Sequence, residues 1–254
     1  MNKSRSRGIR STWARYLRSL LFNIGFYGST TIWSVFVLLA CPLKFERRFQ
    51  IARGWARFNI WWLERTCRIR CEIRGLEHIQ TSRPGIILAK HQSAWETIFL
   101  QILSFPQIWV MKRELLRIPV FGWALRTLQS IEVDRNAPSA AAKLLLKQGT
   151  HHLREGRWIV IFPEGTRVAP GSRGRYNVGG AWLAAHSGYP IFPIAHNAGY
   201  RWPRRGFIKY PGTIQLVIGP PIESVGQKPQ TLIRLTEDWI EETMIQLDQA
   251  NESP

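Results

Sequence analysis

The chain has 254 residues, and 45% of them are hydrophobic, which is enough for the core of one α/β-sized domain and excludes an intrinsically disordered chain. Its 35 lysines and arginines against 17 acidic residues give a net charge of +18, so we expect anionic partners: phosphates, anionic lipid or nucleic acid. The 3 cysteines have no CxxC spacing, which argues against a zinc site or a disulfide framework and fits a reducing compartment.

The first 65 residues predict a helical segment that docks on a membrane. Residues 19–43 carry no charge, and a run of about 25 residues is long enough to span a bilayer. Polar residues and glycines interrupt this run, and basic residues flank both of its ends, so the distribution of charge sets no orientation. A helix that dips into one leaflet and returns fits the sequence as well as a single span does.

Residues 45–65 predict a second helix, in which aromatic residues alternate with arginines. Apolar rings with arginines that reach the headgroups are typical of a helix at a membrane interface. A helix that packs on the core with a solvated basic face fits equally well. Nucleic-acid binding is a third interpretation, but no nucleic-acid motif supports it and we expect no such partner. We therefore divide the chain into a membrane-associated segment, 1–65, and an α/β domain, 66–254.

Beyond residue 65 the hydrophobic pattern predicts alternating strands and helices. The strands are expected at 68–74, 85–89, 108–111, 130–133, 158–162, 191–195 and 213–218. The helices are expected after Ser93 and at 114–129, 138–154, 179–186 and 231–247, with breaks at Pro119 and Gly122 in the first of these ranges and Gly188 closing the third. This alternation predicts an α/β fold with a mostly parallel mixed sheet flanked by helices.

The strand at 85–89 ends at a histidine, His91, just before a predicted helix. Ser93 and Glu96 have the spacing of a capping box, in which the glutamate reaches back to the backbone N–H of the serine. The positive end of the helix favours a neutral imidazole, as a general base requires, and a carboxylate five residues on can accept its ring N–H. Alternatively, Glu96 is only a capping residue and His91 an ordinary loop histidine.

Three further strand ends carry polar residues that we expect beside His91, because the carboxyl ends of parallel strands share one edge of the sheet. Lys112 ends the strand at 108–111, Arg135 follows the strand at 130–133, and 164–167 follow the strand at 158–162. Cations that converge at such an edge are suited to phosphate, above all arginine, whose planar fork matches the phosphate oxygens.

With these motifs the sequence resembles the glycerolipid acyltransferase family, in particular its lysophosphatidate acyltransferases. The motifs follow one another in the family's order over roughly residues 68–220. The His-x4-Asp motif is similar to 91–96, the second motif to 112–123 with 133–135, Phe-Pro-Glu-Gly-Thr-Arg is unchanged at 162–167, and the apolar-proline-apolar strand is similar to 191–194. Two residues depart from the family: Glu96 replaces the usual aspartate, and Asn177 stands where relatives often carry lysine.

The resemblance implies transfer of a fatty acyl group from a thioester, acyl-CoA or acyl carrier protein, to the sn-2 hydroxyl of lysophosphatidic acid. His91 would be the general base and Glu96 would hold its tautomer. The residues expected to bind substrate are Lys112, Arg135, Glu164, Gly165, Thr166 and Arg167. Glu164 either organises Arg167 and its loop or touches the acceptor itself. Neither a metal nor a cofactor is implied, and the absence of a Gly-x-Ser-x-Gly elbow fits direct attack without an acyl-enzyme.

The same resemblance places the protein at the cytoplasmic face of the cell inner membrane, in contact with anionic lipids. Two alternatives remain open at the level of sequence. The acceptor is another lysophospholipid or an ornithine-type lipid, or the chain is a non-enzymatic basic protein that binds membranes.

Overall fold

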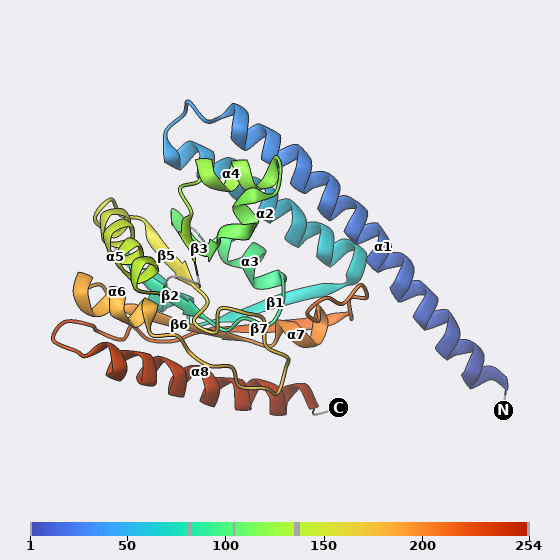
Figure 1. Ribbon diagram of the computed structural model, residues 1–254. Coiled ribbons are helices and arrows are strands. Elements are labelled where there is room, and N and C mark those ends of the chain that lie inside the picture. Colours follow the sequence, from blue (N-terminus) through green and yellow to red (C-terminus); the bar gives the residue numbers. More distant parts are fainter. Residues whose placement is uncertain (1, 81–82, 104, 135–137, 253–254) are drawn as a thin grey trace.

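A computed structural model describes residues 2–80, 83–103, 105–134 and 138–252. The strands of this part form one seven-stranded sheet in the order β1-β7-β6-β2-β5-β3-β4 (Figure 1). They are β1 Ile69–Arg74, β2 Ile86–Ala89, β3 Gln107–Lys112, β4 Ile131–Val133, β5 Trp158–Ile161, β6 Ile191–His196 and β7 Gly212–Ile218. Every neighbouring pair is parallel except β6 with β7. The predicted α/β class with a mostly parallel mixed sheet is confirmed.

Helices cover both faces of the sheet (Figure 1). They are α1 Asn2–Leu39, α2 Phe45–Cys67, α3 Trp95–Phe99, α4 Phe121–Thr127, α5 Pro138–Arg154, α6 Gly179–Ser187, α7 Ala198–Arg201 and α8 Pro229–Glu252, with short 3-10 turns η1 Leu76–Ile79, η2 Leu100–Ile102 and η3 Arg113–Arg117. The ends of α5 agree with the prediction from the sequence. The predicted end of α6 at Gly188 is also confirmed, since this glycine caps the helix in a left-handed conformation with φ 71°.

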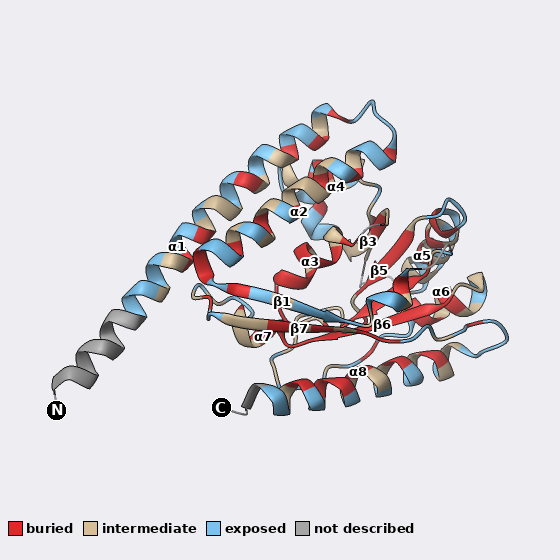
Figure 2. Cartoon of the chain, turned by 180° about the vertical axis from the view of Figure 1, so that it is seen from behind, coloured by how far each residue is buried: buried red, intermediate tan, exposed pale blue. Residues whose placement is uncertain are grey.

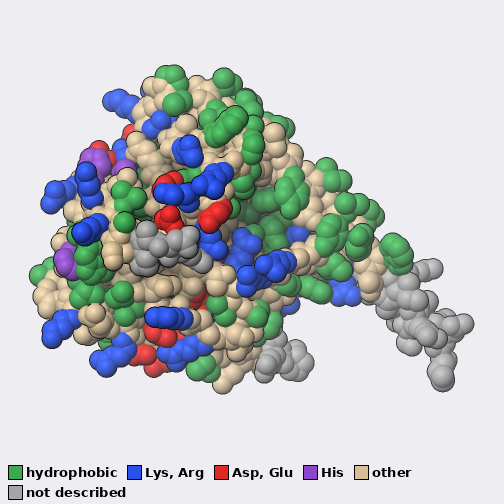
Figure 3. Space-filling model, viewed as in Figure 1, with side chains coloured by type: hydrophobic (Ala, Val, Ile, Leu, Met, Phe, Trp, Pro, Cys, Tyr) green, Lys and Arg blue, Asp and Glu red, His purple; other side chains and the backbone are tan. Residues whose placement is uncertain are grey.

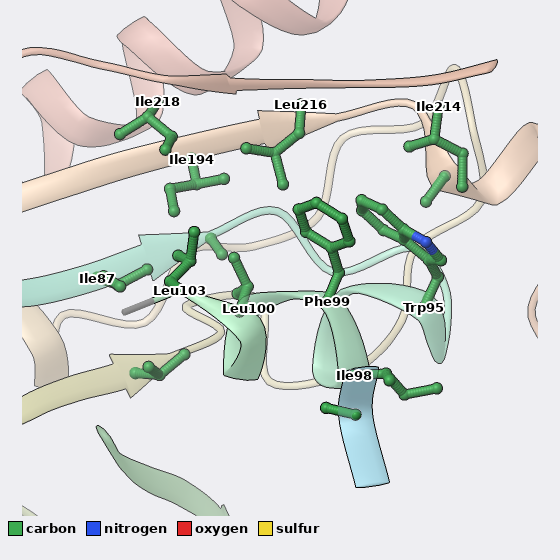
Figure 4. Close-up of a cluster of buried hydrophobic side chains, with 14 of the residues drawn as sticks. Ile87, Trp95, Ile98, Phe99, Leu100, Leu103, Ile194, Ile214, Leu216 and Ile218 are labelled. Carbon is green, nitrogen blue, oxygen red and sulfur yellow. The ribbon is translucent and has the colours of Figure 1, made fainter. Parts of the chain in front are cut away.

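The central strands send alternate side chains into two separate parts of the core, as the period of two requires. Ile87 and Ile194 face α3 and its neighbours, in the cluster that Figure 4 shows. Ile86 and Ile159 face the opposite way, where they meet residues of α5, α6 and α8. Because β2 and β5 are buried on both faces, they read in the sequence as continuous apolar runs.

The helix predicted over 114–129 is broken at Pro119, as predicted, but not at Gly122, which lies inside α4. Its first part is the 3-10 turn η3 rather than an α-helix, and Ile118, Pro119 and Val120 separate this turn from the short helix α4. Val120 has a positive φ of 62°, which a β-branched residue rarely adopts, so the chain changes direction there. The helix predicted after Ser93 is also short, since α3 passes into η2 at Leu100.

The N-terminal helices α1 and α2 lie side by side and form a hairpin (Figure 1). Residues Thr12–Leu39 of α1 form a helix long and apolar enough to cross a membrane, and an 18-residue stretch within it has a mean hydropathy of 1.3 and is 22% buried. Figure 2 shows that much of α1 is exposed, whereas the sheet is buried. Its exposed side chains include large apolar ones such as Trp13, Leu17 and Ile24.

These helices are also joined to the core of the α/β domain. Phe22 of α1 is fully buried, and its ring centroid lies 5.0 Å from that of Trp202. The side chain of Lys209 donates to Oδ1 of Asn23 at 2.7 Å, and its backbone N–H donates to Oγ of Ser19 at 2.9 Å. The boundary predicted near residue 65 falls within the last turn of α2, so the division into two parts stays a prediction.

Candidate active site

The ring of His91 lies just beyond the end of β2 and is held by the carboxylate of Glu96. Nδ1 of His91 is 2.8 Å from Oε1 of Glu96. Because an ionised carboxylate only accepts, Nδ1 carries the proton and Nε2 is left with its lone pair. Nε2 has no hydrogen-bond partner among the described residues, and 14% of the His91 side chain is exposed.

Glu96 is fully buried, yet its surroundings favour the charged form. Its oxygens accept the backbone N–H groups of Gln92 at 3.0 Å and of Ser93 at 2.8 Å. Burial alone would raise the pKa of Glu96, but the imidazoles of His196 and His91 and the N–H of Ser93 bring that pKa below its ordinary value. A carboxylate that stays ionised can hold the His91 ring in one tautomer and stabilise the imidazolium when it forms.

The predicted capping box forms in part. Glu96 reaches back to the backbone N–H of Ser93, as predicted. The serine hydroxyl accepts the N–H of Trp95 at 3.2 Å, one residue earlier than in a capping box, and donates to the carbonyl of Trp202 at 2.7 Å. Ser93 therefore also ties the start of α3 to the segment after α7.

The loop 162–168, which follows the neighbouring strand β5, holds His91 in place. The ring of Phe162 stacks on the imidazole with centroids 4.1 Å apart. Oε2 of Glu164 accepts the backbone N–H of His91 at 2.8 Å, and the N–H of Val168 donates to the His91 carbonyl at 2.7 Å. Both backbone groups of His91 are thus bound by one loop, which fixes the direction of the ring.

A buried lysine lies beneath this loop. Nζ of Lys90 is 2.8 Å from Oε1 of Glu164 and 2.7 Å from Oε1 of Glu241 in α8, and its side chain is 1% exposed. The hydroxyl of Tyr176 donates to the same oxygen of Glu241 at 2.7 Å. Burial raises the pKa of Glu164, and the Lys90 ammonium acts against that rise. The sequence analysis assigned no role to Lys90, Tyr176 or Glu241.

His196, at the end of β6, was also missed. Its ring is fully buried, and its Nε2 donates to the carbonyl of Lys90 at 2.9 Å and lies 3.8 Å from Oε2 of Glu96. Its Nδ1 accepts the N–H of Ala198 at 3.3 Å, so the neutral ring satisfies both neighbours. Burial lowers the pKa of His196 in agreement with this neutral form. The position of His196 directly after the apolar run 191–195 could have indicated a buried histidine at the same edge of the sheet as His91.

Of the three cations predicted at this edge of the sheet, the structure describes Lys112 and Arg167. β2, β5, β3 and β4 are parallel neighbours, so Lys112 lies at the same edge as His91, two strand spacings away or about 10 Å. The guanidinium of Arg167 makes no hydrogen bond or ion pair with the described residues, while its carbonyl accepts from Nη1 of Arg204 at 2.7 Å. Arg135 lies outside the described residues.

Gly165 and Thr166 form the turn between Glu164 and Arg167. Gly165 has a positive φ of 63°, and its N–H donates to the carbonyl of Phe162 at 2.9 Å, so the loop turns back directly after the strand. Thr166 is exposed. Asn177, where lysine was expected, donates from its side chain to the carbonyl of Pro163 at 2.8 Å and so braces the same loop.

One group of donors among the described residues could hold a metal, and it lies away from His91. The ligand atoms of His151, His152 and Glu155, at the end of α5, are all within 4.8 Å of one another. Nη1 of Arg157 is 2.6 Å from Glu155 and 3.2 Å from Nδ1 of His152, so a cation already neutralises this group.

Comparison with known proteins identifies the family and agrees with the fold. The family model described as Acyltransferase matches residues 70–197, which include β2 to β6 and the residues His91, Glu96 and Glu164, but not Glu241 of α8. The chain belongs to this acyltransferase family and is an enzyme.

Individual relatives support the same assignment. Over 236 residues the chain is 44% identical to a 1-acyl-sn-glycerol-3-phosphate acyltransferase of Pseudomonas aeruginosa, covering 91% of each protein. It is 28% identical to the chloroplastic 1-acyl-sn-glycerol-3-phosphate acyltransferase LPAT1 of Arabidopsis thaliana, with 82% of this chain and 57% of that protein covered. The crystal structure of the acyltransferase PlsC from Thermotoga maritima has the same fold, with a TM-score of 0.74 at 22% identity over 92% of this chain and 97% of that one.

Proposed function

We propose that this enzyme transfers a fatty acyl group from a thioester to the sn-2 hydroxyl of lysophosphatidic acid and so makes phosphatidic acid. The observation that carries the proposal is the His91 ring, whose Nδ1 is bound to Glu96 at 2.8 Å and whose Nε2 has no partner among the described residues. The 44% identity to the Pseudomonas aeruginosa protein, whose name specifies this acceptor, supports the choice of lysophosphatidic acid.

In the proposed reaction, Nε2 of His91 takes the proton of the acceptor hydroxyl while its oxygen attacks the thioester carbonyl. The Glu96 carboxylate stabilises the imidazolium that forms. The carbon–sulfur bond then breaks, and the leaving thiolate takes the proton from the imidazolium, so no acyl-enzyme is needed. His91 and Glu96 are the catalytic residues in this scheme, and neither a metal nor a cofactor takes part in it.

The acceptor phosphate would bind to the cations at the same edge of the sheet. Arg167 supports this role, because its guanidinium is free of partners among the described residues. Arg135 and Lys112 are the further candidates, together with the turn at Gly165 and Thr166. Glu164 contacts Lys90 and the backbone of His91, which favours the organising role over direct contact with the acceptor.

The shape of the molecule is consistent with a lipid acceptor. Figure 3 shows a recess with a hydrophobic wall, bordered by Lys and Arg side chains, between the N-terminal helices and the sheet. We propose that α1 holds the enzyme at the cytoplasmic face of the inner membrane, where anionic lipids attract its basic surface. Protease added to sealed spheroplasts would then leave the α/β domain intact, and protease added to inverted vesicles would digest it.

The test is a thiol-release assay in vesicles with lysophosphatidic acid as acceptor and either acyl-CoA or acyl-acyl carrier protein as donor. Lysophospholipids with larger head groups and a lyso-ornithine lipid are run in parallel. We expect phosphatidic acid as the product, and the rates with the two carriers identify the donor. Thiol release with another acceptor alone, or with none, contradicts the proposal.

The His91→Ala variant tests the role of the base in the same assay. General base catalysis contributes about 10²–10⁴-fold to the rate, so the variant should lose at least about 100-fold in kcat while its melting temperature stays close to that of the wild type. Near-normal turnover by a folded variant would remove His91 from the mechanism.

A further inference from the structure

Four charged or hydroxyl-bearing side chains connect the C-terminal helix α8 to the catalytic histidine. Lys90 directly precedes His91 in the sequence and is buried. Its ammonium binds Glu164 at 2.8 Å and Glu241 at 2.7 Å, and it donates to the carbonyl of Ser172 at 3.4 Å. The contacts with Glu241 and Ser172 are hydrogen bonds, and the contact with Glu164 is an ion pair.

The two oxygens of Glu164 have different partners. Oε1 faces Lys90, while Oε2 accepts the backbone N–H of His91 at 2.8 Å. The position of Glu164 therefore depends on Lys90, and the direction of the His91 backbone depends on Glu164. Glu241 completes the connection from α8, and Tyr176 donates a hydrogen bond to it.

The charges in this network do not cancel, because one ammonium faces two carboxylates. A buried carboxylate without a cation takes up a proton, and protonated Glu164 would be a weaker acceptor for the His91 N–H. Around His91 itself lie Glu96 of α3, His196 of β6, Lys90 and Glu164, with Glu241 of α8 behind them.

We propose that Lys90 and Glu241 are positioning residues for His91. Glu241 anchors the Lys90 ammonium from α8, and this ammonium holds Glu164 against the His91 backbone. Neither residue touches substrate in this scheme. The inference rests on the proposed role of His91 as the general base, and it gives one residue of α8, Glu241, a part in positioning this base although the helix lies on the other side of the sheet from α3 (Figure 1).

The experiment uses the full-length protein in vesicles with Lys90→Met and Glu241→Gln. Glu237→Gln is the matched control, since Glu237 lies one turn earlier in α8 and pairs with Arg173 at the surface. Glutamine at 241 can still accept from Tyr176 and Lys90, so only the negative charge is removed. The measurements are the melting temperature, kcat, the KM for each substrate, and the pH dependence of His91 carbethoxylation, which is followed by mass spectrometry.

A base displaced by about 1 Å can lose about 100-fold in rate, so we expect Lys90→Met to lower kcat at least about 10-fold and to leave both KM values within about threefold. In Glu241→Gln, the loss of a negative charge behind His91 should move the midpoint of its carbethoxylation to lower pH. Glu237→Gln should match the wild type in kcat and in this midpoint.

The inference is overturned if Glu241→Gln and Glu237→Gln have the same midpoint and Lys90→Met keeps its kcat. It is also overturned if the variants lose activity only through a lower melting temperature with an unchanged midpoint. Carbethoxylation does not require turnover, so a wild-type protein that fails to acylate lysophosphatidic acid would contradict the proposed function while the midpoints still decide this inference. If Lys90→Met does not fold, the midpoint of Glu241→Gln alone decides it.

Discussion

At the scale of single residues, Glu96 serves the helix and the histidine at once. One oxygen is shared between Nδ1 of His91 and the N–H groups that precede α3, and the other also reaches Ser93. Capping and orienting the imidazole are therefore not alternative roles for this residue. The extra methylene of glutamate, compared with the aspartate of the family motif, is compatible with a short contact to the ring.

Replacing Glu96 with glutamine tests this double role. A glutamine has one acceptor oxygen in place of two, so at least one buried N–H or the ring N–H loses its partner. We expect a loss of about 10–10²-fold in kcat and about 1–3 kcal/mol in the free energy of unfolding. Steady-state kinetics and denaturant titration measure the two losses. Wild-type kcat in Glu96→Gln would show that the carboxylate does not orient the base.

Arg167 is the residue that should distinguish the acceptor from the donor. A hydrogen bond to a charged group contributes about 1.5–3 kcal/mol, so Arg167→Gln should raise KM for lysophosphatidic acid about 10–100-fold and change KM for the thioester little. Arg234→Gln is the control, because Arg234 is exposed on α8 and has no assigned role. Equal increases in both KM values would count against phosphate binding by Arg167.

At the scale of elements, the turn between η3 and α4 depends on close backbone contact. Gly122 lies so near η3 that a Cβ placed on it would be 2.6 Å from the carbonyl carbon and oxygen of Leu116. Any larger residue must push two backbone segments apart. The sequence predicted a break in the helix at Gly122 but not this close approach, which arises from tertiary contact rather than from the local pattern.

Gly122→Ala should therefore destabilise the protein by about 1–3 kcal/mol, as overpacking does. Gly179→Ala is the matched control at the start of α6, where a Cβ would meet only Leu145 at an ordinary 3.6 Å. Because alanine is the better helix former, the control should be neutral or more stable by up to about 1 kcal/mol. Denaturant midpoints compare the two variants, and equal midpoints would contradict the packing argument.

Elements with a strong local pattern were predicted well, and contacts between distant segments were not. The sequence predicts β2 and β5 from their continuous apolar runs and α5 from its Ala/Leu-rich pattern. Burial on one or both faces of an element gives its hydrophobic residues a characteristic spacing. His91 and Glu96 were found because they are five residues apart. Glu241 was not, since it follows Lys90 by 151 residues and only the fold brings them together.

At the scale of the whole molecule, Lys209 joins the N-terminal helices to the α/β domain. Its ammonium contacts Asn23 of α1 and lies over the rings of Phe22, Trp202 and Phe207, at 5.0–5.7 Å from their centroids. Burial lowers the pKa of Lys209 to about 8. A cation is thus held in a largely aromatic environment at the junction between the two parts of the protein.

This lysine predicts a rise in stability at alkaline pH. In the unfolded chain its pKa is 10.5, and in the folded protein it is about 8, so between these values the folded state binds fewer protons. The free energy of unfolding should therefore increase as the pH rises from about 8 towards 10.5, relative to a Lys209→Met variant. Denaturant titrations in detergent at several pH values provide the comparison. Parallel pH curves for the two proteins would contradict it.

Because Phe22 of α1 is buried against Trp202, the enzyme cannot be made water-soluble simply by deleting α1. Cutting away the first helix would uncover the aromatic pocket around Trp202 and strip Lys209 of its Asn23 acceptor. The truncated enzyme would lose the exposed apolar face of α1 but would expose the apolar pocket around Trp202 instead. Polar replacements at outward positions such as Trp13, Leu17 and Ile24 leave that junction in place and offer the better route to a detergent-free form.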